Sequence, residues 1–224
     1  MSGTLANAAA ILAGGALGLL LRRGLSERCQ QLVNQAMGLA VVVIGLKMAL
    51  SGKEEIITVI SLALGAVLGE AADLDGRLQR FAQWLTARAG ERFGDVGHSF
   101  VTAALLYCIG GMSIVGSLRE GLLGDASILY TKGVIDGAIA IILAASQGVG
   151  VLLSAVPVAL YQGGITWAAG TLQSLVTEPV LAAISGAGGT LILAIGLNML
   201  EITRVRLANL LPSLPLAVVL ALVW

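Results

Sequence analysis

Residues 44–48 read IGLKM, and residues 195–199, near the other end of the chain, read IGLNM. The agreement extends to the flanks, because Gly38 corresponds to Gly189 at the same offset. Chance is the competing explanation, since short matches arise easily in a chain rich in glycine, alanine, leucine and isoleucine. We interpret the match as an internal repeat, which is the signature of a fold built from related parts.

The chain is far more apolar than a soluble domain. Of its 224 residues 57% are hydrophobic and 12% charged, and its mean hydropathy is +0.94, whereas soluble domains have about 45–50% apolar and about 25% charged residues. The sequence therefore predicts a membrane protein that contacts the lipid bilayer. A net charge of zero gives no attraction to nucleic acid. Two unspaced cysteines and a single histidine predict no metal site, no cofactor and no disulfide.

Eight apolar stretches are long enough, or nearly so, to cross a bilayer as a helix of about 17–25 residues. The fifth is short, and a glycine-rich segment at residues 146–150 connects it tightly to the sixth. We expect an all-α polytopic membrane helix bundle with about eight spans, at residues 5–21, 32–50, 56–72, 99–117, 133–147, 149–167, 180–200 and 207–224.

The distribution of cationic side chains predicts the orientation. Arg22 and Arg23 follow the first apolar stretch, which places the N-terminus outside. With eight spans, nine arginines then lie in cytoplasmic segments and three cations in external ones, as the positive-inside rule requires, and both termini are external. The cytoplasmic arginines are Arg22, Arg23, Arg28, Arg77, Arg80, Arg88, Arg92, Arg204 and Arg206, and the external cations are Lys53, Arg119 and Lys132.

Residues 76–90 carry apolar side chains at helical spacing with arginines on the other side. This pattern predicts one cytoplasmic amphipathic helix, which either lies in the membrane interface or packs as a cap on the bundle. It links the first three spans to the last five within a single transmembrane domain, residues 1–224. The expected division is repeat one at 1–72, the interfacial linker helix at 73–97, middle spans at 98–148 and repeat two at 149–224.

The predicted topology decides the sense of the repeat. The matching motifs lie on the second and seventh spans, and an odd number of crossings separates them, so the two spans run in opposite directions. The glycine pairs at 14–15 and 163–164, on the first and sixth spans, obey the same parity. Such an inverted repeat is the internal symmetry of many secondary transporters.

Charged and amide side chains inside the predicted spans are the candidate site. Intramembrane charges are rare and usually face a bundle interior or a water-filled path. Asp136 follows Lys132 at the spacing at which helical side chains pair, so either Asp136 is functional or Lys132 at the external mouth merely neutralises it. Buried amides serve a path or bond one helix to another. The candidate path residues are Asn7, Lys132, Asp136, Gln147, Gln162 and Asn198.

Glycine pairs recur well inside the spans and have two interpretations. Small residues let helices approach closely, which is the commoner case. Alternatively, they mark hinges or helix breaks whose freed backbone groups bind a substrate near the midplane. The candidate hinge or break residues are Gly14, Gly15, Gly110, Gly111, Gly163 and Gly164.

The sequence carries no signature of catalysis. It has no phosphate-binding loop, no dinucleotide fingerprint and no serine-hydrolase motif. An intramembrane enzyme would need a catalytic pair, such as serine with lysine or two aspartates, and Asp136 is the one intramembrane aspartate. We therefore expect that the protein is not an enzyme.

Four stretches resemble the YqgA-like family of small bacterial inner-membrane proteins, a domain of unknown function. They are residues 132–137 (KGVIDG), 146–164 (SQGVGVLLSAVPVALYQGG), 188–200 (GGTLILAIGLNML) and 209–214 (NLLPSL). The opening of the chain, with Asn7 and the glycine pair at 14–15, is similar as well. The resemblance implies a multi-pass protein of the bacterial inner membrane with one fold over nearly the whole chain, and it implies no activity.

Two functions fit these patterns. The first is a secondary transporter or channel for a small solute or ion, driven by a gradient and with a polar path near the midplane. The alternative is a structural or assembly protein, a scaffold for other inner-membrane proteins in which the amides only join helices. Glycine-rich outer faces would allow a homo-oligomer in either case.

Overall fold

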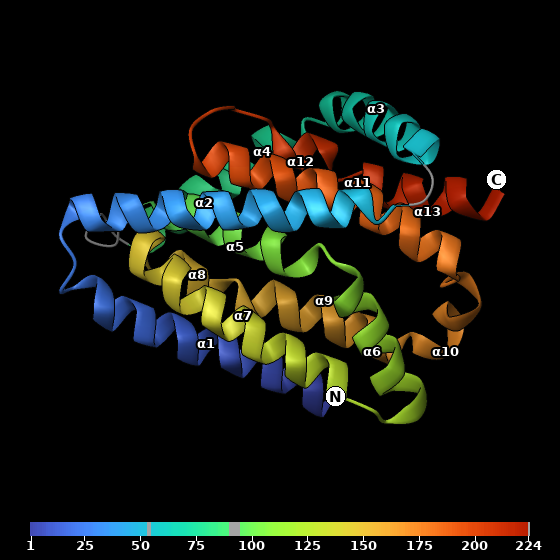
Figure 1. Ribbon diagram of the computed structural model, residues 1–224, viewed down its shortest axis with the longest axis horizontal. Coiled ribbons are helices and arrows are strands. Elements are labelled where there is room, and N and C mark those ends of the chain that lie inside the picture. Colours follow the sequence, from blue (N-terminus) through green and yellow to red (C-terminus); the bar gives the residue numbers. More distant parts are fainter. Residues whose placement is uncertain (53–54, 90–94, 224) are drawn as a thin grey trace. The chain divides into compact units, whose positions relative to one another are not determined.

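The computed structural model describes residues 1–52, 55–89 and 95–223, and this part of the chain is helical without a strand (Figure 1). Lys53, Arg92 and Gly90 lie outside the described residues. The elements are α1 (Ser2–Arg22), α2 (Glu27–Leu50), α3 (Glu55–Ala71), α4 (Leu74–Ala89), α5 (Val96–Cys108), α6 (Gly111–Leu123), α7 (Ser127–Gln147), α8 (Gly150–Leu153), α9 (Ala155–Trp167), α10 (Ala169–Leu172), η2 (Gln173–Leu175), α11 (Glu178–Met199), α12 (Leu207–Leu210) and α13 (Ser213–Val223).

Five segments are long and apolar enough to cross a membrane, and up to seven if each of two bent helix pairs is one span. The polytopic helical fold predicted from the sequence is therefore confirmed, and the eighth predicted span corresponds to an apolar stretch that is shorter than the others. The last apolar stretch is short, at Leu207–Val223, and is divided into α12 and α13 around Pro212. Proline lacks the backbone N–H that a continuous helix needs.

Two other predicted spans have different limits. The fifth is not short, because α7 begins at Ser127 and has 21 residues. Lys132 and Asp136 lie within α7, and their side chains are buried and paired with each other. The fourth is not one rod, since α5 and α6 meet at a bend of 61°. The amphipathic helix predicted at residues 76–90 is present as α4, where Phe81 and Trp84 are exposed and Arg88 lies over the Trp84 ring.

The chain forms two compact units that alternate along the sequence. Unit 1 comprises Met1–Gln35, Ala82–Cys108 and Met112–Gln173, and unit 2 comprises Ala36–Phe81, Ile109–Gly111 and Ser174–Trp224. The boundaries fall within α2 and α4 as well as beside the α5–α6 break. Each unit is therefore built from segments that lie far apart in the sequence.

Unit 1 is organised around the parallel pair α1 and α7, which lie side by side in blue and yellow in Figure 1. Gly3 packs on Leu129 near the start of both helices, and Gly18 packs on Ile141 and Ala144 near their ends. A side chain at Gly14 would collide with the backbone of Gly137 in α7. The backbones thus approach as closely as small residues permit.

Helix α9 runs antiparallel to α1 in the same unit. A Cβ atom at Gly163 would lie 3.9 Å from Thr4, near the start of α1, whereas Gly15 farther along packs on Leu152, which precedes α9. Helices α5 and α8 also pack together, because Gly150 lies against Ser99 and the backbone of Val96. The interior of unit 1 is therefore enclosed by helices from three separate parts of the sequence.

Unit 2 contains an antiparallel pair made by α2 and α11, the helices that carry the repeated motif. Gly38 packs on Leu200, Gly45 packs on Leu193, and Gly189 packs on Ala49. Ascending positions in α2 thus meet descending positions in α11. The rest of the unit is small and apolar, with a buried cluster of Ile57, Ala183, Ala187 and Ala217.

Candidate functional site

The buried face of α1 changes character along its length. Thr4 and Asn7 are buried in the first half of the helix, and Asn7 is fully shielded from solvent. Beyond them the buried face continues with Ile11 and the glycines at 14, 15 and 18. The spacing of three or four residues places all of these on one side of the helix, so one half of the buried face is polar and the other half is not.

Helices α7 and α9 repeat this division. In α7, which is parallel to α1, the buried Lys132 and Asp136 precede Ala140 and Leu143. In α9, which is antiparallel, the order is reversed, with Val158 first and then Gln162 and Thr166. The polar halves of the three helices therefore lie toward the N-terminal ends of α1 and α7.

Lys132 and Asp136 form a buried ion pair at the centre of this polar half. The Lys132 ammonium donates to the Asp136 carboxylate one helical turn away, and the two residues are only 7% and 5% exposed. The Lys132 nitrogen also lies 6.0 Å from the centroid of the Tyr107 ring. The Asn7 amide is close to the Asp136 carboxylate, because Gly133 lets α1 approach α7 at this level.

Five buried polar side chains of unit 1 have atoms with no hydrogen-bond partner among the described residues, and two of them, Asn7 and Tyr107, lie beside the ion pair. They come from α1, α5, α6 and α9, and Gln162 is fully buried with both amide atoms unpartnered. Each such group costs about 1–3 kcal/mol when it is left unsatisfied. We call them, together with the ion pair, the polar cluster: Asn7, Tyr107, Ser117, Lys132, Asp136, Gln162 and Thr166.

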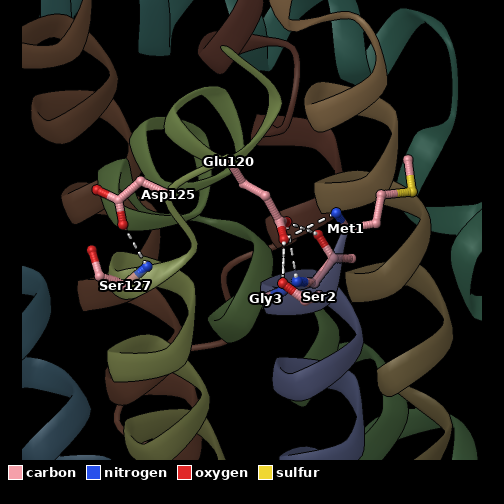
Figure 2. A network of polar contacts seen from close by, with 7 residues as sticks. Met1, Ser2, Gly3, Glu120, Asp125 and Ser127 are labelled. Atoms are coloured by element: carbon pink, nitrogen blue, oxygen red, sulfur yellow. Dashed lines mark hydrogen bonds and ion pairs between the residues drawn. The ribbon is translucent and has the colours of Figure 1, made fainter. Parts of the chain in front are cut away.

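Glu120 lies at the end of the polar half and was not among the predicted residues. Its carboxylate accepts hydrogen bonds from the backbone N–H groups of Gly3 at 2.7 Å and Thr4 at 3.4 Å, and from the Ser2 and Thr4 hydroxyls (Figure 2). The N-terminal ammonium is 3.1 Å away. A buried carboxylate thus satisfies the free N–H groups that begin α1, where the helix dipole also favours an anion.

A second carboxylate begins α7. Asp125 accepts a hydrogen bond from the backbone N–H of Ser127 at 3.0 Å (Figure 2) and pairs with Arg119 at 2.8 Å. The contacts with Ser127 hold the pKa of this exposed carboxyl below its ordinary value, with a smaller effect of Arg119. Glu120 and Asp125 therefore order the starts of α1 and α7, the helices that carry the centre of the cluster.

Two of the predicted path residues lie away from the cluster. Gln147, at the far end of α7, donates to Asn34 at 2.8 Å. Asn198, in unit 2, donates to the Val205 carbonyl at 2.8 Å and accepts from Thr203 and from the Val205 N–H. Asn198 thus orders the loop after α11. The structure brings together Asn7, Lys132 and Asp136 and buries Gln162 in α9 of the same unit, whereas Gln147 and Asn198 lie in separate hydrogen-bonded arrangements.

The glycine pairs also differ from one another. Helices α1 and α9 continue without interruption through the pairs at 14–15 and 163–164, so neither pair lies at a break of its helix. Gly14 and Gly15 instead allow close packing. Gly110 and Gly111 do lie at a break, between α5 and α6.

A second polar group of unit 2 surrounds Glu70 and Asn209. Asn209 donates to Glu70 at 2.6 Å and accepts from the backbone N–H of Asp75 at 2.7 Å, while Arg206 pairs with Glu70 at 2.8 Å. Glu70 and Arg206 are more than half exposed and line an open pocket of about 600 Å³. These contacts join the α3–α4 connection to α12, and the charges are satisfied.

Comparison with known proteins identifies relatives over the full length. The family model described as "Protein of unknown function (DUF554)" matches residues 2–222. "Uncharacterized membrane protein YdfK" of Bacillus subtilis (strain 168) is 33% identical over 218 residues, covering 96% of this chain and 93% of the relative. "Uncharacterized protein YqgA" of Escherichia coli (strain K12) is 33% identical over 227 residues, covering 99% of this chain and 97% of the relative. No solved structure matches.

Proposed function

Since the chain belongs to the DUF554 family and is similar to an uncharacterised membrane protein over nearly its full length, we propose that it is a secondary carrier for a small solute or ion in the bacterial inner membrane. Its path passes along the polar cluster of unit 1, and both termini are external. In this proposal the protein is not an enzyme. A gradient drives the transport, because the sequence has no ATP-binding signature.

The observation that carries this proposal is the burial of an ion pair among polar side chains that lack partners. Removing two charges from water is costly even when they pair, so a buried ion pair is weak evidence for a role in stability. Polar groups in membrane helices that face the interior commonly line a substrate or ion path. The polar cluster has both properties, on helices long enough to span a membrane.

The one-sided position of the cluster favours a carrier over an open channel. The polar residues extend from the N-terminal ends of α1 and α7 to about the middle of these helices. Beyond that point the buried faces are apolar and closely packed, with Ile11, Ala140 and Leu143 among them. Alternating access requires a path that is sealed on one side at a time, and in the proposed carrier these apolar faces form the seal.

The α2–α11 pair supports an inverted repeat. Under the offset that aligns the two motifs, the contact of Gly38 with Leu200 corresponds to that of Gly189 with Ala49. Helices that carry equivalent motifs and pack antiparallel have the local symmetry that many secondary transporters use. We place the repeat in unit 2 as a scaffold for movement, not as part of the binding site.

Cysteine accessibility tests the proposed path without knowledge of the substrate. Cys29 and Cys108 are first replaced by alanine. Single cysteines are then introduced at Thr166, at Gln162 and at Val158, which lies four residues before Gln162 on the same face of α9 and is the matched control. Intact cells are treated with a membrane-impermeant, charged methanethiosulfonate reagent. We expect modification at Thr166 and Gln162 and protection at Val158.

Protection of all three positions in folded protein would contradict the proposal and favour a membrane scaffold with a dry interior. Modification of all three would indicate an open channel instead of a sealed carrier. Modification from the cytoplasmic side alone would reverse the proposed orientation.

A further inference from the structure

We infer that the polar cluster binds a small uncharged solute that both donates and accepts hydrogen bonds, such as a polyol or a carboxamide. This inference rests on the proposed function and specifies the class of substrate. It follows from the charge balance of the cluster, from the chemistry of the atoms left unpartnered and from their spacing.

The charges near the site are already matched within the protein. Lys132 and Asp136 are in direct contact and neutralise each other. The Glu120 carboxylate is engaged by the start of α1, through Gly3, Thr4 and the N-terminal ammonium. An ion that entered this half of unit 1 would therefore add an uncompensated charge to a buried environment, which is strongly unfavourable. A neutral solute adds none.

The unpartnered atoms are amides and hydroxyls. Asn7 and Gln162 each present an NH₂ donor and a carbonyl acceptor, and Tyr107, Ser117 and Thr166 each present a hydroxyl that can donate or accept. A solute with hydroxyl or amide groups complements both kinds of atom at once. In contrast, an anion or a cation would use only one kind and would leave the other buried and unsatisfied.

A bare cation is the strongest competitor, because amide and hydroxyl oxygens coordinate Na⁺ or K⁺. Two features disfavour it. The Lys132 ammonium lies beside Tyr107, so a second cation near that hydroxyl would be repelled. The amide nitrogen of Gln162 would also remain without an acceptor.

The spacing of the groups limits the solute to a few heavy atoms. Gln162 and Thr166 are one helical turn apart on the buried face of α9, which separates them by about 6 Å along the axis. Thr4, on α1, lies beside Gly163 at the level of this turn. Urea and glycerol are shorter than this separation, but with a hydrogen bond to each group they can bridge it, and both molecules carry donors and acceptors, so they are suitable probes.

Flux into proteoliposomes tests the inference with these probes. Radiolabelled urea and glycerol are compared with ²²Na⁺, ⁸⁶Rb⁺ and ³⁶Cl⁻, with protein-free vesicles as the baseline. We expect protein-dependent, saturable flux of urea or glycerol and ion flux at baseline. Gln162→Leu should lower the neutral flux about tenfold, the effect of losing about 1.4 kcal/mol of hydrogen bonding. If the leucine variant does not fold, Gln162→Met is used instead, because the methionine side chain is about as long as that of glutamine.

Two buried serines of unit 1 supply a matched pair. Ser117 and Ser154 are both fully buried, but the Ser117 hydroxyl has no partner in the described structure, whereas that of Ser154 donates to the Val151 carbonyl at 2.6 Å. Ser117→Ala should therefore lower the neutral flux, by about fivefold for one weak hydrogen bond. Ser154→Ala should leave it unchanged.

The outcomes separate this inference from the proposed function. Protein-dependent ion flux without neutral flux would overturn the inference and leave the carrier intact. Neither flux, with the labelling pattern of α9 intact, would also overturn the inference, because the path would then accept neither probe. Equal losses in Ser117→Ala and Ser154→Ala would show that packing, and not solute binding, sets the flux. Failure of the proposed carrier function would instead be seen as protection of all three α9 positions from the cysteine reagent.

Discussion

The α1–α7 pair of unit 1 and the α2–α11 pair of unit 2 are both brought together by glycine, yet their interiors differ. Gly14 and Gly18 let α1 approach α7, just as Gly38 and Gly45 let α2 approach α11. The first pair carries a buried ion pair and the buried Asn7 amide, whereas the second unit has an alanine-rich apolar cluster. Close glycine packing therefore marks rigidity in both units, and buried polarity is what distinguishes the candidate site.

The largest expected effect is the loss of one partner from the buried ion pair. Lys132→Met leaves Asp136 as an uncompensated buried charge and should lower the free energy of unfolding by about 3–5 kcal/mol. The double variant Lys132→Met, Asp136→Leu should recover most of this loss, since an apolar pair of similar volume is often tolerated. Unfolding in detergent measures both variants. A double variant no more stable than the single would show that the two charges do not act as a pair.

The glycine seam of unit 2 should be almost as sensitive. A Cβ atom at Gly45 would lie 2.7 Å from the Leu193 Cα atom and 2.8 Å from the Ile192 carbonyl carbon, and backbone atoms cannot move aside easily. Gly45→Ala should therefore destabilise by about 1–3 kcal/mol through overpacking. Gly164, with open space around its position in α9, is the control. Gly164→Ala should be neutral or stabilise by about 0.5–1 kcal/mol. Equal losses of stability in the two variants would contradict the close packing of Gly45 on α11.

A comparable loss is expected when the carboxylate at the start of α1 is removed. Glu120→Gln keeps the shape and loses the charge-assisted hydrogen bonds to Gly3 and Thr4, so we expect a loss of about 1.5–3 kcal/mol. Glu70→Gln in unit 2 breaks a pair that is more than half exposed, and it should cost about 0–1 kcal/mol. Thermal unfolding of the two variants compares them directly. A larger loss for Glu70→Gln would reverse the contrast between the units.

The smallest effect concerns pH and Asp125. Its folded-state pKa is lowered by the contacts with Ser127, so the stabilisation is present above the ordinary pKa of about 3.9 and is lost as the pH falls through the folded value. Asp125→Asn should therefore reduce the loss of stability on acidification. Unfolding midpoints of wild type and variant between neutral and acid pH provide the test. Identical pH dependence would show that Asp125 does not contribute.

The sequence predicts the helices and the ion pair at the centre of the site, but it does not predict site residues whose role depends on contacts between helices. The intramembrane pair Lys132 and Asp136 stands out because charges are rare in apolar spans. Glu120 does not, since the predicted span ends at residue 117 and a glutamate beside Arg119 resembles an ordinary loop residue. Two serines and one glutamate at helical spacing, Ser113, Ser117 and Glu120, would have indicated a buried polar face of α6.

Amide side chains illustrate the same limit. Gln147, Gln162 and Asn198 are equivalent from sequence, because each is an amide in or near an apolar stretch. The structure gives Gln147 and Asn198 hydrogen-bond partners, whereas Gln162 has none among the residues that the structure describes. The difference depends on which helix faces each amide, and a span pattern does not contain that information. The alternation of the two units along the chain was unpredictable for the same reason.

The pairing of α1 with α7 has a consequence for biosynthesis. More than a hundred residues separate the two helices, and at about 5–20 residues per second the ribosome needs roughly 5–25 s to make them. During this interval the face of α1 that carries Thr4 and Asn7 has no α7 to cover it. Membrane insertion of this protein therefore includes a waiting period in which its first helix must be held by the insertion machinery or by lipid headgroups until its partner arrives.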